Sequence, residues 1–285
     1  MNKKSRKKTV FLALFSFGLI VFVFLSTYIY VDNSRNREVS RVVRDVSRSA
    51  DNDTVGKVAT NNVSLSSSGK ISTAKTDKKT TKVADAHKPA VDVGKLSLTN
   101  EDIFAWINIP GTAVDYPVVQ HPTDDEYYLK HGADGMKSSH GCPYIELSDS
   151  KTFMEFNTVI YGHNMNDGSM FASLHKYESK DFFDKNRDLY VYTTEHTLKY
   201  KIFAAVMFND RHIPYYYDDT ILSDRTTFLQ DIQKDIVAKR SIIAGDMKVT
   251  EKDKLITLST CDKKLRSNRY LVVAKLITID GQDVG

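Results

Sequence analysis

The sequence predicts a mainly β protein with a few helices, folded as a closed or nearly closed barrel of about eight strands. From about residue 96 onward, short apolar runs alternate with turn signals such as Pro110-Gly111. Most of these runs are connected by loops, which favours a barrel of neighbouring strands over alternating strands and helices. The runs lie at 105–109, 114–119, 143–147, 158–161, 189–193, 198–208, 255–258 and 270–279.

One long helix is predicted over residues 222–238, inserted between late strands. Phe228, Ile232 and Ile236 recur there at four-residue spacing and form an apolar stripe. Such a stripe is typical of packing against a core, so we expect this helix to lie against the barrel. A shorter helix is predicted over 169–177.

Charge divides the chain into two parts. Residues 1–95 contain 18 Lys and Arg against 8 Asp and Glu, a net charge of +10, whereas residues 96–285 contain 22 against 28, a net charge of −6. A basic chain raises the question of nucleic-acid binding. Because the basic excess lies outside the predicted folded domain, 96–285, the pattern argues against a nucleic-acid partner.

A membrane anchor is predicted over residues 10–31. This stretch of 22 residues has no charge and no proline, and a helix of that length crosses a hydrocarbon core of about 30 Å. A cleaved signal peptide is the alternative, but its apolar region is usually shorter and ends at a small-residue cleavage site. The basic tail, 1–9, favours a cytoplasmic N-terminus and a C-terminal domain outside the cell membrane.

Residues 32–95 are predicted to be a polar, flexible linker. No aromatic residue occurs between Val31 and Ile103, and 49–90 is rich in Ser, Thr, Asn, Asp, Lys and Ala. Such a composition cannot bury enough apolar surface to offset the entropy lost on ordering. The linker would tether the folded domain above the membrane.

The two cysteines, Cys142 and Cys261, are too few for a disulfide framework or a four-thiolate zinc site. They could be small buried residues, one disulfide, or include a reactive thiol. Cys261 ends a β-run and faces a basic loop, a setting that favours the reactive thiolate. Cys142, between Gly141 and Pro143, has no such setting. The basic residues after Cys261 are Lys263, Lys264, Arg266 and Arg269.

Two further side chains fit thiol chemistry. His163 begins a loop directly after a strand that ends at Tyr161-Gly162, and imidazole can exchange protons with a thiol and with a leaving amine. Arg269 opens the last apolar strand, where a cation could stabilise an oxyanion. A salt bridge is the alternative role for Arg269. Arg266 lies nearby, but only Arg269 directly precedes the strand.

Several motifs together resemble the sortase family over about residues 98–280. They are T-L-S-T-C at 257–261, Y-G-H at 161–163, and the arginine that begins the following strand. The segments 106–112 and 115–120 are also similar to that family. G-H-N-M followed by G-S-M-F, and the inserted long helix, resemble class B members in particular. This resemblance implies an eight-stranded sortase-type β-barrel.

The resemblance also implies an activity, that of a thiol peptidase acting as a transpeptidase in a Gram-positive type of cell envelope. Cys261 would attack a sorting signal of the NPxTx or LPxTG kind at its threonine, His163 would protonate the leaving peptide, and an amino group would resolve the thioester. That amine would belong to a peptidoglycan precursor (lipid II) or to a pilin lysine. Arg269 and the backbone around Thr260 would hold the substrate or the oxyanion, and Ser259 and Asn164 would orient the site. No metal and no cofactor are expected.

Two other function classes stay open at this point. A cysteine protease would use the same pair of side chains with water as the acceptor. A non-enzymatic anchored receptor would not need Cys261 at all. A separate hypothesis is an inactivating disulfide between Cys142 and Cys261.

Overall fold

The computed structural model describes residues 26, 27, 31, 91–234, 240–263 and 267–284. The predicted tail (1–9), nearly all of the anchor (10–31), and most of the linker (32–95) lie outside these residues. Among the residues that the structure describes, no helix combines the length and hydrophobicity needed to cross a membrane.

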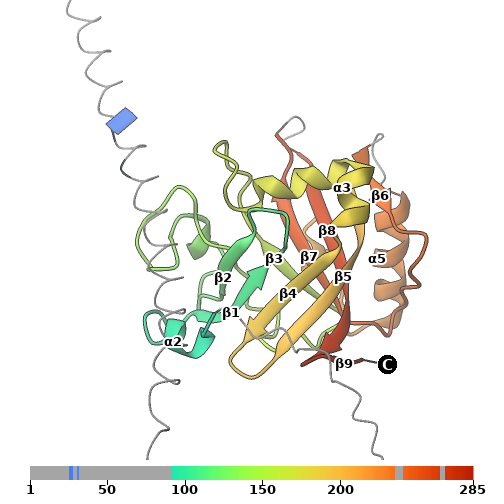
Figure 1. The fold of residues 1–285 in the computed structure, drawn as a ribbon, viewed down its shortest axis with the longest axis horizontal. Helices are drawn as coiled ribbons and strands as arrows, with labels where there is room; N and C mark the ends of the chain where they lie inside the picture. The colour runs from blue at the N-terminus through green and yellow to red at the C-terminus, as the bar shows by residue number, and fades with distance from the viewer. Residues whose placement is uncertain (1–25, 28–30, 32–90, 235–239, 264–266, 285) are drawn as a thin grey trace, which may run out of the picture.

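The described residues form a nine-stranded sheet that curls into a barrel (Figure 1). Five of the six contacts along its main path are antiparallel, and β3 and β7 pair in parallel. The short strands β6 (Ile242–Ile243) and β9 (Gln282–Asp283) add to β5 and β8. The path runs through β2 (Asp115–Val119), β1 (Ile103–Asn108), β4 (Asp188–Thr193), β5 (Thr197–Phe208), β8 (Arg269–Ile279), β7 (Leu255–Cys261) and β3 (Asn157–Tyr161).

Tyr144 links the two edge strands, β2 and β3. It forms a bridge to Val119 on one side and to Tyr161 on the other, and the Tyr161 amide donates to its carbonyl at 2.8 Å. The predicted barrel is confirmed, but the strand expected over 143–147 is reduced to this bridge. The two-residue strands β6 and β9 were not predicted, because they are too short to show alternation.

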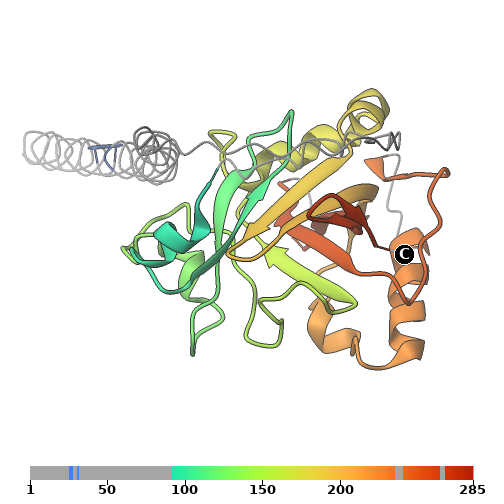
Figure 2. The same ribbon diagram turned by 60° about the horizontal axis from the view of Figure 1, so that its bottom comes forward.

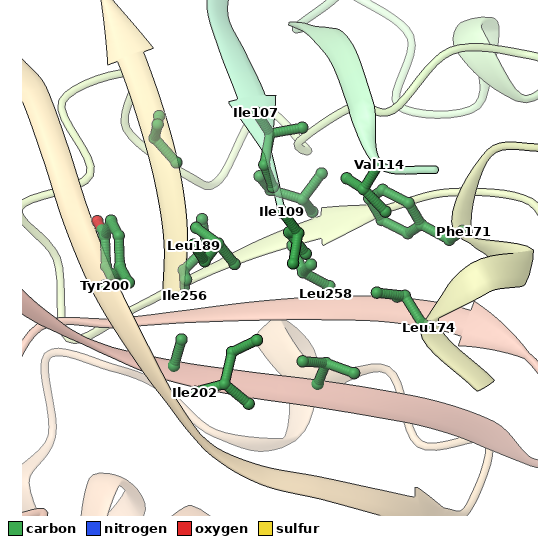
Figure 3. Close-up of a cluster of buried hydrophobic side chains, with 14 of the residues drawn as sticks. Ile107, Ile109, Val114, Phe171, Leu174, Leu189, Tyr200, Ile202, Ile256 and Leu258 are labelled. Atoms are coloured by element: carbon green, nitrogen blue, oxygen red, sulfur yellow. The ribbon is translucent and has the colours of Figure 1, made fainter. Parts of the chain in front are cut away.

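The barrel interior is filled by alternate side chains from the strands, as Figure 3 shows for part of the cluster. Along β5, Tyr200 and Ile202 point inward. An irregularity in the pairing with β8 between Ile202 and Ala204 shifts the alternation, so that Phe203 and Ala204 both lie in the outer cluster. A bulge of this kind lets a long strand bend around the barrel.

The helix α5 (Leu222–Lys234) lies between β5 and β7 in the chain and beside the barrel in space (Figures 1 and 2). Its buried residues Phe228, Leu229 and Ile232 share an apolar cluster with outward-facing residues of β5, β7 and β8. The predicted helix is therefore confirmed over 222–234, and residues 235–238 lie outside the described residues.

The remaining helices are short. The helix expected over 169–177 is the 3-10 helix η2 (Phe171–Glu178). The others are α2 (Val93–Ser97), η1 (Tyr127–Leu129), α3 (Lys180–Lys185) and α4 (Ile213–Tyr216). In α2, Val93 and Leu96 are buried in a cluster with Trp106 of β1, so this helix covers the outside of that strand.

A buried carboxyl group lies beside the start of β3. Asp149 is 8% exposed, and its side chain accepts a hydrogen bond from the Val159 amide at 3.3 Å. Burial raises the pKa of Asp149 to about 8, and nearby carboxylates, foremost Glu155, act in the same direction. In the folded protein this group therefore keeps its proton at pH values where the unfolded chain releases it.

We predict that Asp149→Asn stabilises the protein relative to wild type increasingly as the pH rises from about 4 to about 8. In this pH window the carboxyl of the unfolded wild-type chain ionises, whereas the carboxyl of the folded protein keeps its proton. Wild type therefore loses stability as the pH increases. The amide of the variant cannot ionise, so its stability lacks this dependence on pH. Urea unfolding of both proteins across this range measures the difference. Two pH profiles that stay parallel would contradict the assignment.

Candidate active site

Cys261 lies on the outer face of the barrel, at the end of β7. Side chains alternate along a strand, and Ile256 and Leu258 point into the interior. Cys261, at an odd-numbered position, is therefore directed outward, and it is exposed. α5 contacts the outer side of the same strand nearer its start, where Leu255 belongs to the outer cluster. The cysteine end of the strand stays open.

The neighbouring strands bring His163 and Arg269 to the same place. Arg269 is the direct antiparallel partner of Cys261 across β7 and β8. On the other side, β3 pairs in parallel with Tyr161 opposite Ser259, and the Gly162 amide donates to the Ser259 carbonyl at 3.1 Å. Cys261, His163 and Arg269 all line one groove of about 360 Å³.

The tautomer of His163 follows from its hydrogen bond. Its Nε2 atom lies 2.8 Å from the carbonyl oxygen of Leu129. Because a carbonyl oxygen only accepts, Nε2 must carry a proton, which leaves Nδ1 as the nitrogen that can exchange one. Gly141 packs closely beside this ring: a Cβ there would lie 2.4 Å from the Tyr128 carbonyl and 3.2 Å from His163 Cδ2.

Two tyrosines and a histidine–carboxylate pair line the groove beyond the three predicted side chains. The rings of Tyr144 and Tyr161 stack with centroids 5.4 Å apart, and the Tyr161 hydroxyl is buried without a hydrogen-bond partner. Beside them, His212 stacks on Tyr161 with ring centroids 6.4 Å apart, and its Nε2 atom lies 2.7 and 2.8 Å from the two carboxylate oxygens of Glu146. Sequence reasoning missed these residues, although Tyr161 lies within the Y-G-H motif.

The groove contains charges of both signs. Burial raises the pKa of Glu146, and the hydrogen bond from His212 opposes that rise. Burial also raises the pKa of Tyr144 and of Tyr161, so both phenols stay neutral. The lining acidic residues are Asp125, Glu126, Glu146 and Asp210, and the basic ones are Arg211, His212 and Arg269. A substrate in this groove would contact neutral aromatic rings as well as charged side chains.

The three residues predicted to orient the site are also here. Thr260 is buried and its hydroxyl donates to the Gly162 carbonyl at 2.7 Å. Ser259 is 4% exposed and lines the groove. Asn164 lies on the side of Cys261 that faces η2, where its Nδ2 atom donates to the Cys261 carbonyl at 2.7 Å. All six predicted site residues are thus brought together at one end of β7.

One group of possible metal ligands occurs among the described residues. It consists of His175, Glu178 and Asp262. Arg240 Nη2 lies 2.5 Å from Glu178 Oε1 and 2.6 Å from Asp262 Oδ2. An arginine already balances both carboxylates, so these side chains form an ion-pair cluster whose geometry does not suit a cation.

Cys142 has a different environment from Cys261. It is buried, its Sγ atom lies 3.6 Å from the Pro117 carbonyl oxygen, and burial, with a smaller contribution from Asp134, raises the pKa of its thiol. A thiol of this kind is inert. Both cysteines are free, so the hypothetical disulfide is not formed in this structure.

Comparisons with known proteins agree with this geometry. A family model described as a sortase domain matches residues 107–277. The chain is 36% identical over 185 residues to Sortase B of Listeria monocytogenes, covering 64% of this chain and 73% of that protein. It is 29% identical over 188 residues to Sortase B of Staphylococcus aureus, covering 65% and 74%.

Solved structures show the same fold. The crystal structure of Clostridium perfringens sortase B matches with a TM-score of 0.58 and 26% identity, over 65% of this chain and 99% of that one. A Staphylococcus aureus sortase B–substrate complex matches with a TM-score of 0.57 and 28% identity, over 65% and 84%.

A curled β-barrel with a cysteine, a histidine and an arginine in one outer groove defines a family of cysteine transpeptidases. This chain belongs to that family, the sortases. Its similarity to sortase B proteins in both sequence and structure places it in class B.

We predict that Gly162→Ala destabilises the protein by about 1–3 kcal/mol, because added volume in a packed core forces neighbours to move. A Cβ at Gly162 would lie 2.6 to 2.9 Å from ring atoms of Phe171, which is fully buried. Gly245→Ala is the matched control, since a Cβ there meets no atom within 4 Å. Urea unfolding of both variants measures the effect, and equal stabilities would refute this packing argument.

Proposed function

We propose that this protein is a membrane-anchored cysteine transpeptidase that cleaves a C-terminal sorting signal after its threonine and transfers the new carboxyl end to an amine. The observation that carries the proposal is that Cys261, His163 and Arg269 line one groove at the open end of β7. Membership of the sortase family supports the same reaction class.

The first half-reaction forms a thioester and begins with Cys261 as the thiolate and His163 as the imidazolium, because Nδ1 has taken the proton of the thiol. The Cys261 thiolate attacks the carbonyl carbon of the threonine, and the carbonyl electrons move onto oxygen. Arg269, paired with Cys261 across the strands, supplies positive charge for this oxyanion. When the intermediate collapses, the carbon–nitrogen bond breaks, and the leaving amine takes a proton from His163 Nδ1.

The second half-reaction releases the product. An incoming amine attacks the thioester carbon, and His163 Nδ1 accepts a proton from the attacking nitrogen. A second oxyanion forms beside Arg269. The carbon–sulfur bond then breaks, which restores the Cys261 thiolate and leaves a new amide bond. The histidine thus ends each cycle with the proton it had at the start.

The substrates proposed are secreted proteins whose sorting signals are of the NPxTx or LPxTG kind. The Staphylococcus aureus sortase B–substrate complex, which has the same fold, supports the binding of a substrate of this class. The acceptor proposed is the amine of a peptidoglycan precursor (lipid II) or a pilin lysine.

The cellular arrangement proposed is a single-pass protein of the cell membrane. Residues 10–31 would cross the bilayer, 1–9 would stay in the cytoplasm, and 32–95 would tether the extracellular catalytic domain, 96–285. The uncharged run of 22 residues after a basic tail supports this arrangement.

We predict that the full chain in detergent cleaves a sorting-signal peptide and, with an added short glycine peptide, forms the amine-captured product. Cys261→Ala should lose this activity by about a thousandfold or more, since removing a nucleophile abolishes the covalent route. Cys142→Ala, which changes the buried thiol, is the control and should stay active. Mass spectrometry of the products provides the measurement.

Each result has a distinct meaning. Hydrolysed product alone, even with excess amine, would favour a protease. No cleavage of any peptide in the panel, with Cys261 also inert to thiol-reactive probes, would refute the enzymatic proposal.

We also predict separate effects on kcat and KM for Arg269. If it stabilises the oxyanion, Arg269→Ala should lower kcat by about 10²–10³-fold with little change in KM. Arg269→Lys should recover part of the loss, because it keeps a cation without the planar fork. Steady-state kinetics with a fluorescent peptide measures both constants. A large rise in KM at unchanged kcat would instead assign Arg269 to substrate binding.

A further inference from the structure

The residue that follows each member of the proposed catalytic pair belongs to one cluster of polar side chains, in which Asp262 is buried and the others are partly exposed. Asn164 comes directly after His163, and Asp262 comes directly after Cys261. The Asn164 side chain contacts the Cys261 carbonyl and His175, and the Asp262 carboxylate contacts Arg240. This cluster lies outside the substrate groove, since Asn164, His175, Arg240 and Asp262 do not line it.

The Asn164 amide determines the direction of the shortest hydrogen bonds in this cluster. The Cys261 carbonyl can only accept, so the Asn164 atom 2.7 Å away must be the amide nitrogen. The same nitrogen lies 2.9 Å from His175 Nε2, which accepts this hydrogen bond when the ring carries its proton on Nδ1 and which also lies 3.4 Å from the Cys261 carbonyl oxygen. The proton of a neutral His175 therefore sits on Nδ1, which donates to Glu178 at 2.8 Å.

Arg240 anchors the other end of this series of contacts. Its Nε atom lies 2.8 Å from Glu178 Oε2, and its Nη2 atom contacts both Glu178 and Asp262. The Asp262 side chain is only 1% exposed. A carboxylate this deeply buried needs its ion partner, because its loss would leave an uncompensated charge beside Cys261.

The ring of His175 is held from a further direction. It stacks on Tyr270 of β8, with centroids 4.7 Å apart and an interplanar angle of 22°. Tyr270 is the cross-strand partner of Thr260, the residue before Cys261. The acceptor nitrogen of His175 therefore has a fixed place relative to the end of β7.

We propose that Asn164, His175, Glu178 and Arg240 are positioning residues that fix the backbone at Cys261 relative to His163. The Asn164 amide ties the loop that carries His163 to the strand end that carries Cys261, and Arg240 ties down the next residue. None of the four needs to touch the substrate. The measurement of kcat that tests this proposal rests on the proposed function, whereas the measurement of Cys261 alkylation does not.

The test compares three variants of the full chain in detergent. Asn164→Leu keeps a similar volume but removes both donated hydrogen bonds. Arg240→Gln removes the charge that balances Glu178 and Asp262. Lys275→Gln is the matched control: Lys275 pairs with Asp253 at 2.8 Å and lies opposite Leu255, at the other end of the same two strands.

We expect Asn164→Leu and Arg240→Gln to lower kcat by about 10–100-fold with KM within about twofold, since small misplacements of reacting groups have effects of this size. Arg240→Lys should recover less than half of the loss, because it cannot contact two carboxylates in a fork. Thermal unfolding should show Asn164→Leu within about 3 °C of wild type, and Lys275→Gln should keep full kcat.

A second readout measures Cys261 without any substrate. In a Cys142→Ala background, Cys261 is the remaining thiol, and its alkylation by iodoacetamide can be followed directly. We expect Asn164→Leu to change this rate by about threefold or more, because thiolate reactivity depends on its neighbouring groups. This comparison decides the proposal even if wild type cleaves no peptide, so the two proposals fail separately.

Three results would overturn the proposal. The first is an unchanged kcat and an unchanged alkylation rate in Asn164→Leu. The second is a loss of kcat that follows a loss of thermal stability and that Lys275→Gln shares, which would make the cluster merely structural. The third is a rise in KM at constant kcat, which would mean that these side chains contact the substrate.

Discussion

Strand β7 is hydrogen-bonded on both sides, to β3 in parallel and to β8 in antiparallel register. This double pairing determines where the chemistry can occur. The antiparallel contact places Arg269 opposite Cys261, and the parallel contact places the loop after Tyr161 beside the same strand end. A shift of one residue in either register would turn a side chain to the other face of the sheet. The apolar side chains on the opposite face of β7 pack in the barrel core, and a shift would turn them toward solvent, so the core prevents it.

The helices cover part of the outer surface of the barrel and leave the end of β7 that carries Cys261 accessible. α5 covers the outer side of β5, β7 and β8 where their residues are apolar, and it leaves the cysteine end of β7 uncovered. η2 approaches that end from the other side and contributes His175 and Glu178 to the cluster behind the cysteine. The thiol is thus exposed toward the groove, while its backbone is held by polar contacts on the other side.

Much of the fold was predictable because its strands and its long helix have strong periodic patterns. The strand at 198–208 and the helix stripe around Phe228 are examples. Elements with too few residues to show a period, such as η1, β6 and the bridge at Tyr144, were missed or overextended. The tyrosines of the groove were missed for a different reason: their apolar rings have the same pattern as core residues, and only the structure shows that they line an opening.

The sequence by itself determined the class of chemistry. A cysteine at a strand end before a basic loop indicates a reactive thiol, and the T-L-S-T-C and Y-G-H motifs indicate one family of thiol enzymes. It also indicated six candidate site residues, because each lies within or beside such a motif. Tertiary structure alone decided how they are held. Asn164 and Cys261 are separated by 97 residues, and Arg240 and Glu178 by 62. No local pattern encodes contacts over such distances, because they arise only when the barrel closes and brings the ends of its strands together.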